Sequence, residues 1–381
     1  MSAEKKRIVK RSKTNSVMEL VASRLGVTPQ ELEREVSGKC KNVLNIAGLD
    51  KAVDLFWSMI DSPVYVYCDY DCDGITSGSI ISIGCNSIGI KPHIIIPRRF
   101  TDGYGIKVKN LENMDPSGLL ITVDNGIAAN EAVDTAKEKG MKVIILDHHE
   151  ARILNGEQFL PEADVVIDPH ITEADFEDYC GAGLAYRFMR EVFAKKRRPA
   201  DLNGIMSSMI ALAAVGTVGD SVTMKAENRF LVRRGMEQIE QKRVSTGLVL
   251  LLEEMKLSDT LSVEDIAYSL VPAINAFGRL EDEGSRKVAA LLSYTGRKSD
   301  GAKNAAQIVK QMNDERKTYC KELTELAEKM VEETGQMNNS VLVLQDDRFL
   351  KGICGIIAGN LTEKYKVPSI VFGAPENGIC V

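Results

Sequence analysis

The chain has 381 residues, of which 44% are hydrophobic and 27% are charged, and its formal net charge is −6 at pH 7. This length predicts two or three domains, and the acidic balance argues against indiscriminate nucleic-acid binding, although basic residues cluster locally. We expect a cytoplasmic protein that does not enter a membrane, because no apolar run approaches the roughly 20 residues of a membrane span and the charged start carries no signal core.

The amino-terminal half alternates short runs rich in Val and Ile with helical segments. Residues 1–16 form a basic tail that we expect to be disordered, and residues 16–25 and 50–60 are predicted helices. The alternation that follows is typical of parallel strands joined by right-handed crossovers, so we predict an α/β fold with an open, mostly parallel sheet and helices on both faces. The predicted strands are residues 64–68, 93–96, 119–123, 142–146 and 164–167, with helices at 75–87 and 128–139 and a loop after residue 146.

From Gly181 onward the pattern changes to helices that cover the sheet. Residues 299–333 then form one long polar helix, which we expect to connect two domains. A new strand, helix and strand (340–344, 352–366 and 369–372) open a second, smaller α/β domain that we expect to be truncated at Val381. The other predicted helices are residues 183–194, 203–218, 225–238 and 285–293. The chain is thus divided into a tail (1–16), a first domain (17–298), a connecting helix (299–335) and an incomplete second domain (336–381).

Four of the predicted strands run directly into aspartates. The carboxyl ends of parallel strands meet at one edge of a sheet, so these carboxylates converge there. Three of the four histidines lie in or just beyond the same strand ends, which predicts a metal site. The residues are Asp69, Asp71 and Asp73 after the first strand, Asp124 after the third, Asp147, His148 and His149 after the fourth, and Asp168 and His170 after the last.

The first acidic motif also matches the front of a calcium-binding EF-hand loop. That loop needs a bidentate Glu at its twelfth position, which is Ile80 here, and an incoming helix in place of the predicted strand. Carboxylates mixed with imidazole favour Mn²⁺ (or Mg²⁺), and two ions would neutralise the repelling carboxylates and activate water for phosphoryl transfer. We expect Asp124 to bridge the ions, His148 to be a ligand, and His149 to contact the phosphate or protonate the leaving oxygen.

An ordered set of motifs resembles the DHH-family phosphoesterases and, within that family, the RecJ-type single-strand exonucleases. The resemblance implies that five residues bind the metals, among them Asp220, which spacing alone would assign to a helix end. The five implied ligands are Asp71, Asp73, Asp124, His148 and Asp220. The motifs are residues 67–74, 99–105, 123–126, 147–149, 216–220 with 227–229, 275–280 and 352–359.

The resemblance also suggests supporting roles around the metals. Asp69 is expected to act beside His149 in the catalytic centre, as a partial ligand or a support for the ligands. Asp147 is expected to orient His148 or its loop, as carboxylates around metal ligands do. For Asp168 we expect a structural or supporting role, and for His170 no direct one.

Several residues are expected to contact the substrate. Arg279 and Asn275 belong to one motif, and Arg279 resembles the family's phosphate-binding arginine. The alternative role for Arg279 is a structural ion pair with Glu281 or Asp282. Arg99 and Tyr104 belong to a loop that resembles a strand-guiding element, in which Tyr104 either stacks on a base or packs internally.

The resemblance implies a metal-dependent exonuclease that hydrolyses phosphodiester bonds of single-stranded DNA by a two-metal mechanism, in DNA repair, recombination or replication. Single-stranded DNA or RNA, and replication or repair proteins, are the implied partners. One alternative is an RNA or oligonucleotide exonuclease of the same family. A Cdc45-like replication-complex subunit is disfavoured because all five metal positions are kept, and a small-molecule pyrophosphatase because Tyr67 replaces a family histidine. Leu350 likewise stands where RecJ-type enzymes usually have a histidine, which puts substrate binding by the second domain in question.

Overall fold

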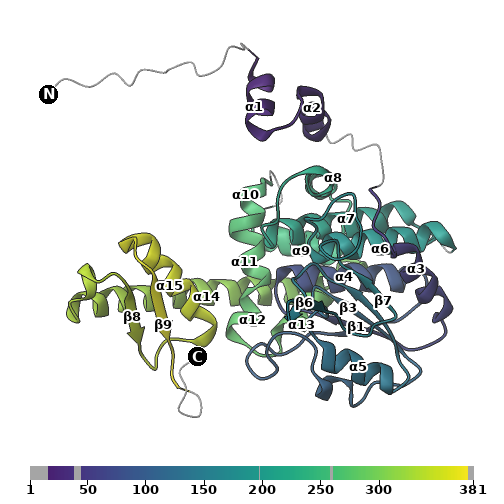
Figure 1. Cartoon of the computed structure of the whole chain (residues 1–381). Coiled ribbons are helices and arrows are strands. Elements are labelled where there is room, and N and C mark those ends of the chain that lie inside the picture. The colour runs from purple at the N-terminus through teal and green to yellow at the C-terminus, as the bar shows by residue number, and fades with distance from the viewer. Residues whose placement is uncertain (1–15, 38–43, 197, 258–260, 376–381) are drawn as a thin grey trace.

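The fold is taken from a computed structural model, in which residues 16–37, 44–196, 198–257 and 261–375 are described. The predicted basic tail lies outside these ranges except for Ser16, whose side chain caps helix α1 (Val17–Leu25). A second short helix, α2 (Pro29–Ser37), follows, and the sequence analysis did not predict it. The pair stands beside α8 (Ala226–Glu240), away from the sheet (Figure 1).

The centre of the fold is a parallel sheet with strand order β2-β1-β3-β4-β7. The chain therefore leaves β1 toward β2 on one side and returns to β3 on the other. Ligands of open α/β sheets bind at such a reversal, beyond the carboxyl ends of the strands. Its strands are β1 (Val64–Cys68), β2 (His93–Ile95), β3 (Leu119–Val123), β4 (Lys142–Leu146) and β7 (Val165–Ile167), which confirms the predicted parallel sheet.

Helices cover both faces of this sheet, as predicted. Successive side chains of a strand point to opposite faces, so Val66 and Cys68 join one core cluster and Tyr67 joins the other. The larger cluster packs the sheet against α3 (Leu49–Ser58), α4 (Cys72–Ser87) and α6 (Gly181–Lys195). The smaller cluster packs it against α5 (Asn130–Glu138) and the 3₁₀ turn η1 (Val108–Leu111).

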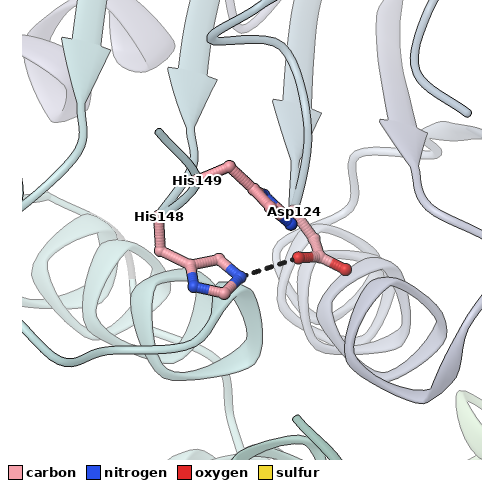
Figure 2. A group of neighbouring side chains, drawn as sticks. All are labelled: Asp124, His148 and His149. Atoms are coloured by element: carbon pink, nitrogen blue, oxygen red, sulfur yellow. Dashed lines mark hydrogen bonds and ion pairs between the residues drawn. The ribbon is translucent and has the colours of Figure 1, made fainter. Parts of the chain in front are cut away.

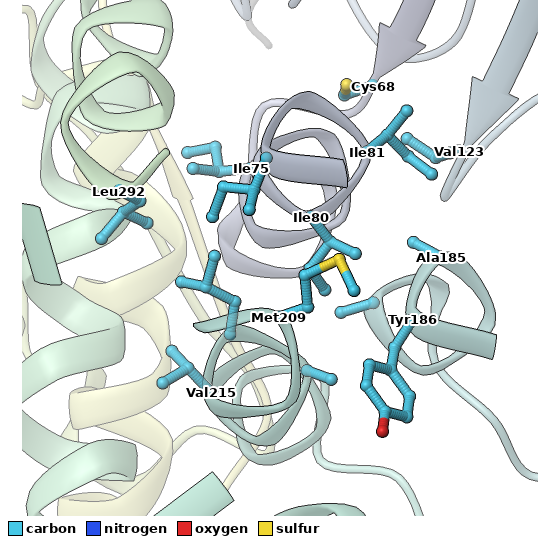
Figure 3. Packing of buried hydrophobic residues seen from close by; sticks show 14 of the residues in the cluster. Cys68, Ile75, Ile80, Ile81, Val123, Ala185, Tyr186, Met209, Val215 and Leu292 are labelled. Carbon is cyan, nitrogen blue, oxygen red and sulfur yellow. The ribbon is translucent and has the colours of Figure 1, made fainter. Parts of the chain in front are cut away.

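Helix α4 lies at the middle of the larger core and is buried on all sides. Figure 3 shows Ile75, Ile80 and Ile81 of α4 surrounded by side chains from the sheet and from neighbouring helices, α7 (Leu202–Gly219) and α13 (Gly284–Leu292) among them. Helix α7 carries no charged residue and has the length and composition of a membrane span, so the expectation that no apolar run approaches that length was wrong. Most of α7 is buried against α4, α6 and α8, which explains its composition.

The long helix α14 (Asp300–Glu333) contributes to two separate hydrophobic clusters. Near its start, Ala306 and Val309 pack into the large core. Near its end, Ala327 and Val331 pack against a small unit of two parallel strands and one helix, which lies apart from the sheet in Figure 1. That unit comprises β8 (Leu342–Gln345), α15 (Lys351–Tyr365) and β9 (Ser369–Phe372).

Several elements differ from the prediction. The predicted loop after residue 146 contains a hairpin, whose turn residues Asn155 and Gly156 both have positive φ angles. An Asn-Gly pair favours this turn, so the signal was present in the sequence. The strands of this hairpin are β5 (Arg152–Leu154) and β6 (Glu157–Phe159).

Helix α9 and a series of short helices before Glu281 were not predicted either. These helices are α9 (Thr246–Glu254), α10 (Val263–Asp265), the π-helix η2 (Ile266–Leu270), α11 (Val271–Ile274) and α12 (Ala276–Leu280).

Candidate metal centre

The turn from β1 into α4 presents the first acidic motif. Helix α4 begins at Cys72, earlier than predicted, because the Oδ1 atom of Asp71 accepts a hydrogen bond from the Gly74 backbone N–H at 3.0 Å and caps the helix. A Cβ atom on Gly74 would lie 2.4 Å from the backbone oxygen of Asp69, so glycine alone lets the helix start so close to the strand end. The local sequence thereby brings Asp69, Asp71 and Asp73 to one edge of the sheet.

Asp124 follows β3 in a left-handed backbone conformation, with φ 59°. Asp and Asn adopt this conformation more readily than other residues with side chains. The next residue, Asn125, is fully buried, and its Nδ2 donates hydrogen bonds to the backbone oxygens of Val123 at 2.9 Å and Tyr67 at 3.3 Å. Asn125 therefore ties the ends of β1 and β3 together and fixes Asp124 next to the first acidic motif.

The structure brings all five predicted metal ligands together. Figure 2 shows the His148 ring directed at Asp124, with 3.0 Å between Nε2 and Oδ1. Asp220, at the end of α7, faces the other ring nitrogen, with 3.8 Å between its Oδ2 and Nδ1. Within the described ranges, three groups have donor atoms within 4.8 Å of one another. They are Asp69 with Asp71 and Asp124, Asp73 with His148 and Asp220, and Asp124 with His148 and His149.

The amino terminus of α6 holds the Asp73 carboxylate. Its oxygens accept hydrogen bonds from the backbone N–H groups of Gly181 at 2.6 Å and Ala182 at 2.9 Å. A Cβ atom on Gly181 would lie 2.7 Å from the Cβ of Asp124, so this position requires glycine. The sequence analysis missed these two residues, although Cys180-Gly-Ala-Gly at a helix start indicates a close backbone approach.

Burial and mutual repulsion raise the pKa values of the clustered carboxyls. Burial, followed by repulsion from Asp73, raises the pKa of Asp220 to about 7, and burial with repulsion from Asp71 does the same for Asp69. The pKa of Asp124 lies well above its ordinary value for the same two reasons. Burial lowers the pKa of His148, which favours the neutral imidazole that binds metals.

These donors fit divalent cations. Carboxylate oxygens and one imidazole form the ligand chemistry of Mn²⁺ or Mg²⁺, and the two groups that contain Asp71 and Asp73 are separate sets of donors. The Oδ1 atom of Asp69 is buried without a hydrogen-bond partner in the described part of the chain. A cation beside it would satisfy this oxygen and remove the repulsion that raises the neighbouring pKa values.

The sequence analysis expected Asp147 to orient either His148 or its loop. The Asp147 carboxylate contacts the ring of His149 and not the ring of His148. The Nδ1 of His149 lies 2.7 Å from the Asp147 Oδ1, and Asp147 also accepts the backbone N–H groups of Ile127 and His148, so its predicted role in the loop is confirmed. Burial alone would raise the pKa of Asp147, but the hydrogen bond from His149 holds it below its ordinary value. Burial alone would lower the pKa of His149, yet Asp147 raises it to about 9. Tyr104 places its hydroxyl 3.3 Å from the same Nδ1.

Asp168 and His170 lie beside this centre and outside the three donor groups. Asp168 is fully buried, and its Oδ1 accepts the His170 backbone N–H at 3.0 Å. Its backbone oxygen accepts the Thr172 hydroxyl at 2.8 Å. Asp168 therefore supports the loop after β7, and the exposed His170 ring lies outside the donor groups.

Arg279 and Arg99 border the β1–α4 turn. The Nη1 of Arg279 donates to the Gly352 backbone oxygen at 3.2 Å, and within the described residues Arg279 forms no ion pair, so the alternative pairing with Glu281 or Asp282 was wrong. Burial, followed by repulsion from Arg99, lowers the pKa of Arg279. The Arg99 guanidinium carbon lies 5.1 Å from the Tyr70 ring centre.

Asn275 lies at the end of α11, in the same motif as Arg279. Its Oδ1 is buried without a hydrogen-bond partner among the described residues, and its predicted contact with the substrate stays a prediction.

Comparison with known protein families identifies this arrangement. The family model for the N-terminal domain of the DHH family matches residues 63–217. Over these residues the chain is similar to the DHH family. The matched range contains β1, β3, β4 and α6, so it covers every predicted metal ligand except Asp220.

The chain is similar to proteins named single-stranded-DNA-specific exonuclease RecJ. It is 30% identical to the one from Escherichia coli strain K12, over 94% of this chain and 63% of the relative. It is also 30% identical to the one from Bacillus subtilis strain 168, over 86% of this chain and 40% of the relative. A crystal structure of exonuclease RecJ bound to manganese matches with a TM-score of 0.73 and 26% identity, over 86% of this chain and 80% of that chain. The chain thus spans less than two thirds of the length of these two curated relatives.

Proposed function

We propose that this protein is a member of the DHH family and a metal-dependent exonuclease that hydrolyses phosphodiester bonds of single-stranded DNA, with a role in DNA repair, recombination or replication. The observation that carries the proposal is the set of donor groups around Asp124, at the reversal point of a parallel sheet. Relatives named as single-stranded-DNA-specific exonucleases support the reaction and the substrate. A related exonuclease structure bound to manganese supports the choice of ion.

In this proposal Asp71, Asp73, Asp124, His148 and Asp220 hold two Mn²⁺ or Mg²⁺ ions. Asp124 belongs to two of the three donor groups, and its Oδ1 lies 3.0 Å from the His148 Nε2, so it would suit a ligand shared by both ions. When bound, such a pair activates a water molecule and stabilises the attacking and leaving oxygens of an in-line displacement. The α6 amino terminus and Asn125 keep Asp73 and Asp124 in place before the ions bind.

His149 is the proposed proton donor. The Asp147 carboxylate stabilises a proton on the His149 Nδ1 and orients the imidazole ring. The protonated imidazole is then available to the leaving oxygen or to a phosphate oxygen. Asp69, with one oxygen lacking a hydrogen-bond partner, supports the Asp71 side of the centre. The nearby guanidinium groups of Arg99 and Arg279 suit a backbone phosphate.

We propose the same division of the chain as the sequence indicated. Residues 17–298 then form the catalytic domain, residues 299–335 the connecting helix and residues 336–381 a second unit that binds substrate. The contribution of α14 to two separate hydrophobic clusters supports this division. We propose that the protein acts in the cytoplasm on single-stranded DNA, together with replication or repair proteins.

The direct test is cleavage of single-stranded DNA and RNA labelled at either end, with Mn²⁺, beside the variant Asp124→Ala. We expect the wild type to release labelled mononucleotides or short products from DNA and the variant to be inactive. Cleavage of RNA alone would transfer the proposal to the RNA exonuclease alternative. Activity that survives in Asp124→Ala would contradict the metal centre itself.

A further inference from the structure

A cavity of about 510 Å³ lies beside His149, next to the donor groups. Three segments enclose it: residues 104–107, residues 126–129, and the start of the loop after β4, up to Arg152. The buried side chains of Ile106 and Ile127 give it an apolar lining. Its size and lining are those of small-molecule sites, which take about 300–1,000 Å³ and combine apolar walls with a few polar groups.

The rim of this cavity carries cations without acidic partners. Lys107 and Arg152 both line the cavity and are exposed, and neither forms an ion pair with another described residue. By contrast, the neighbouring Lys109 is paired with Asp102 at 2.6 Å. Glu150 also lines the cavity, so two cations share the rim with one exposed carboxylate.

The carboxyl group of Asp147, which also lines the cavity, is already engaged, because it accepts hydrogen bonds from His149 and from the backbone N–H of Ile127. Lys107 and Arg152 remain as exposed cations at the rim, beside Glu150. Such cations suit an anion held at the mouth of an apolar cavity.

The cavity and the arginine pair border different parts of the same sheet edge. Arg99 and Arg279 border the turn after β1, whereas the cavity is lined by residues that follow β2, β3 and β4. Asp124 follows β3, which lies between β1 and β4 in the sheet. A single strand whose scissile phosphate lies at Asp124 would thus have both groups of cations along the same edge.

We propose that this cavity binds the base of a nucleotide next to the scissile phosphate, with its backbone phosphate on Lys107 and Arg152. This inference rests on the proposed nuclease function and adds a second subsite to it. The strand is held both by the arginine pair and by the cavity. A substrate too short to reach both is bound less tightly.

The test uses the Mn²⁺-loaded protein and single-stranded DNA oligonucleotides. The double variant Lys107→Ala/Arg152→Ala is compared with Lys51→Ala/Lys303→Ala, which removes the same charge from exposed positions remote from the cavity. We expect KM for a long oligonucleotide to rise about 10-fold in the first variant only. The slope of log affinity against log salt should fall by about 0.7, because the variant loses one single-strand phosphate contact.

A base in the cavity is tested separately with oligonucleotides that carry one abasic site at successive positions. In the wild type, one position should raise KM above the others, and the cavity-narrowing variant Ala128→Trp should remove that difference. Equal KM values for the two double variants, or no position-dependent effect of the abasic site, would overturn the inference. Neither result would contradict the proposed function as long as the wild-type protein cleaves single-stranded DNA. An inactive wild type would instead contradict the proposed function.

Discussion

The side chains of His149 and Asp147 are joined by a hydrogen bond of 2.7 Å, and this bond explains why the pKa of His149 is raised to about 9 although burial opposes its charge. If His149 donates a proton, Asp147→Asn should lower kcat by about 10- to 100-fold, because the ring loses both its orientation and its stabilised charge. The alkaline limb of the rate profile should also move to lower pH. Steady-state rates measured from pH 6 to pH 10 check both effects.

Asp168→Asn is the matched control for that variant. Asp168 is also a buried aspartate at a strand end, but it accepts a hydrogen bond from the backbone of His170 and lies outside the donor groups. Its rate profile should match the wild type. A wild-type profile in Asp147→Asn would refute the role assigned to His149.

The metal-free protein should lose stability as the pH rises. Burial and repulsion raise the folded-state pKa values of Asp69 and Asp220 to about 7, whereas an unfolded carboxyl titrates near 4. Between these values the folded state retains protons that the unfolded state has released, so the free energy of unfolding falls as the pH rises from about 4 to about 7. Urea unfolding with a chelator, repeated with excess Mn²⁺, measures this dependence.

Bound Mn²⁺ should remove most of that loss, since the ion stabilises the ionised carboxylates. The stabilisation by Mn²⁺ should therefore be larger at pH 8 than at pH 5. Equal stabilisation at both pH values would show that the clustered carboxyls are not the ligands.

Gly181→Ala should weaken Mn²⁺ binding by about 10- to 100-fold, as loss of a group that supports a metal ligand does. The added Cβ would lie 2.7 Å from the Cβ of Asp124 and 3.0 Å from the Asp73 Oδ2, so one of these carboxylates must move. Gly355→Ala, inside α15, is the control because nothing lies within 4 Å of its added Cβ. Isothermal titration with Mn²⁺ compares them, and unchanged affinity in Gly181→Ala would contradict the support given by α6.

Glu227 belongs to one of the family-like motifs and is expected to act through folding. Its Oε2 lies 2.6 Å from the Nη1 of Arg187, and both side chains are almost fully buried. Removing one partner of a buried pair leaves an uncompensated charge, so Glu227→Ala should cost about 3–5 kcal/mol of unfolding free energy. Lys329→Ala, which breaks an exposed pair with Glu333 in α14, should change stability little. Similar urea midpoints for the two variants would refute this assignment.

The sheet was predictable because its strands are buried on both faces. Strands of this kind form continuous apolar runs, and the predicted bounds of β1, β3 and β4 match the structure. The convergence of the aspartates followed from the sheet alone. The proposed metal-binding role of Asp220 could come only from family resemblance, because its approach to His148 depends on how α7 packs.

The remaining contacts of the centre depend on tertiary structure. The α6 amino terminus binds Asp73 across 108 residues of sequence, and no local pattern specifies that partner. The pairing of Asp147 with His149 in place of His148 is set by side-chain directions at the end of β4. The start of α4 was predicted too late, at residue 75, because the cap that Asp71 forms on the Gly74 backbone N–H lies ahead of it.

The number of Mn²⁺ ions bound per chain tests the central claim most directly. Equilibrium dialysis of the wild type and of Asp124→Asn, followed by metal analysis and a single-stranded DNA cleavage assay, gives both occupancy and activity. The account predicts two ions per wild-type chain, fewer in Asp124→Asn, and no cleavage by that variant. A single ion in the wild type, or unchanged occupancy and cleavage in Asp124→Asn, would contradict it.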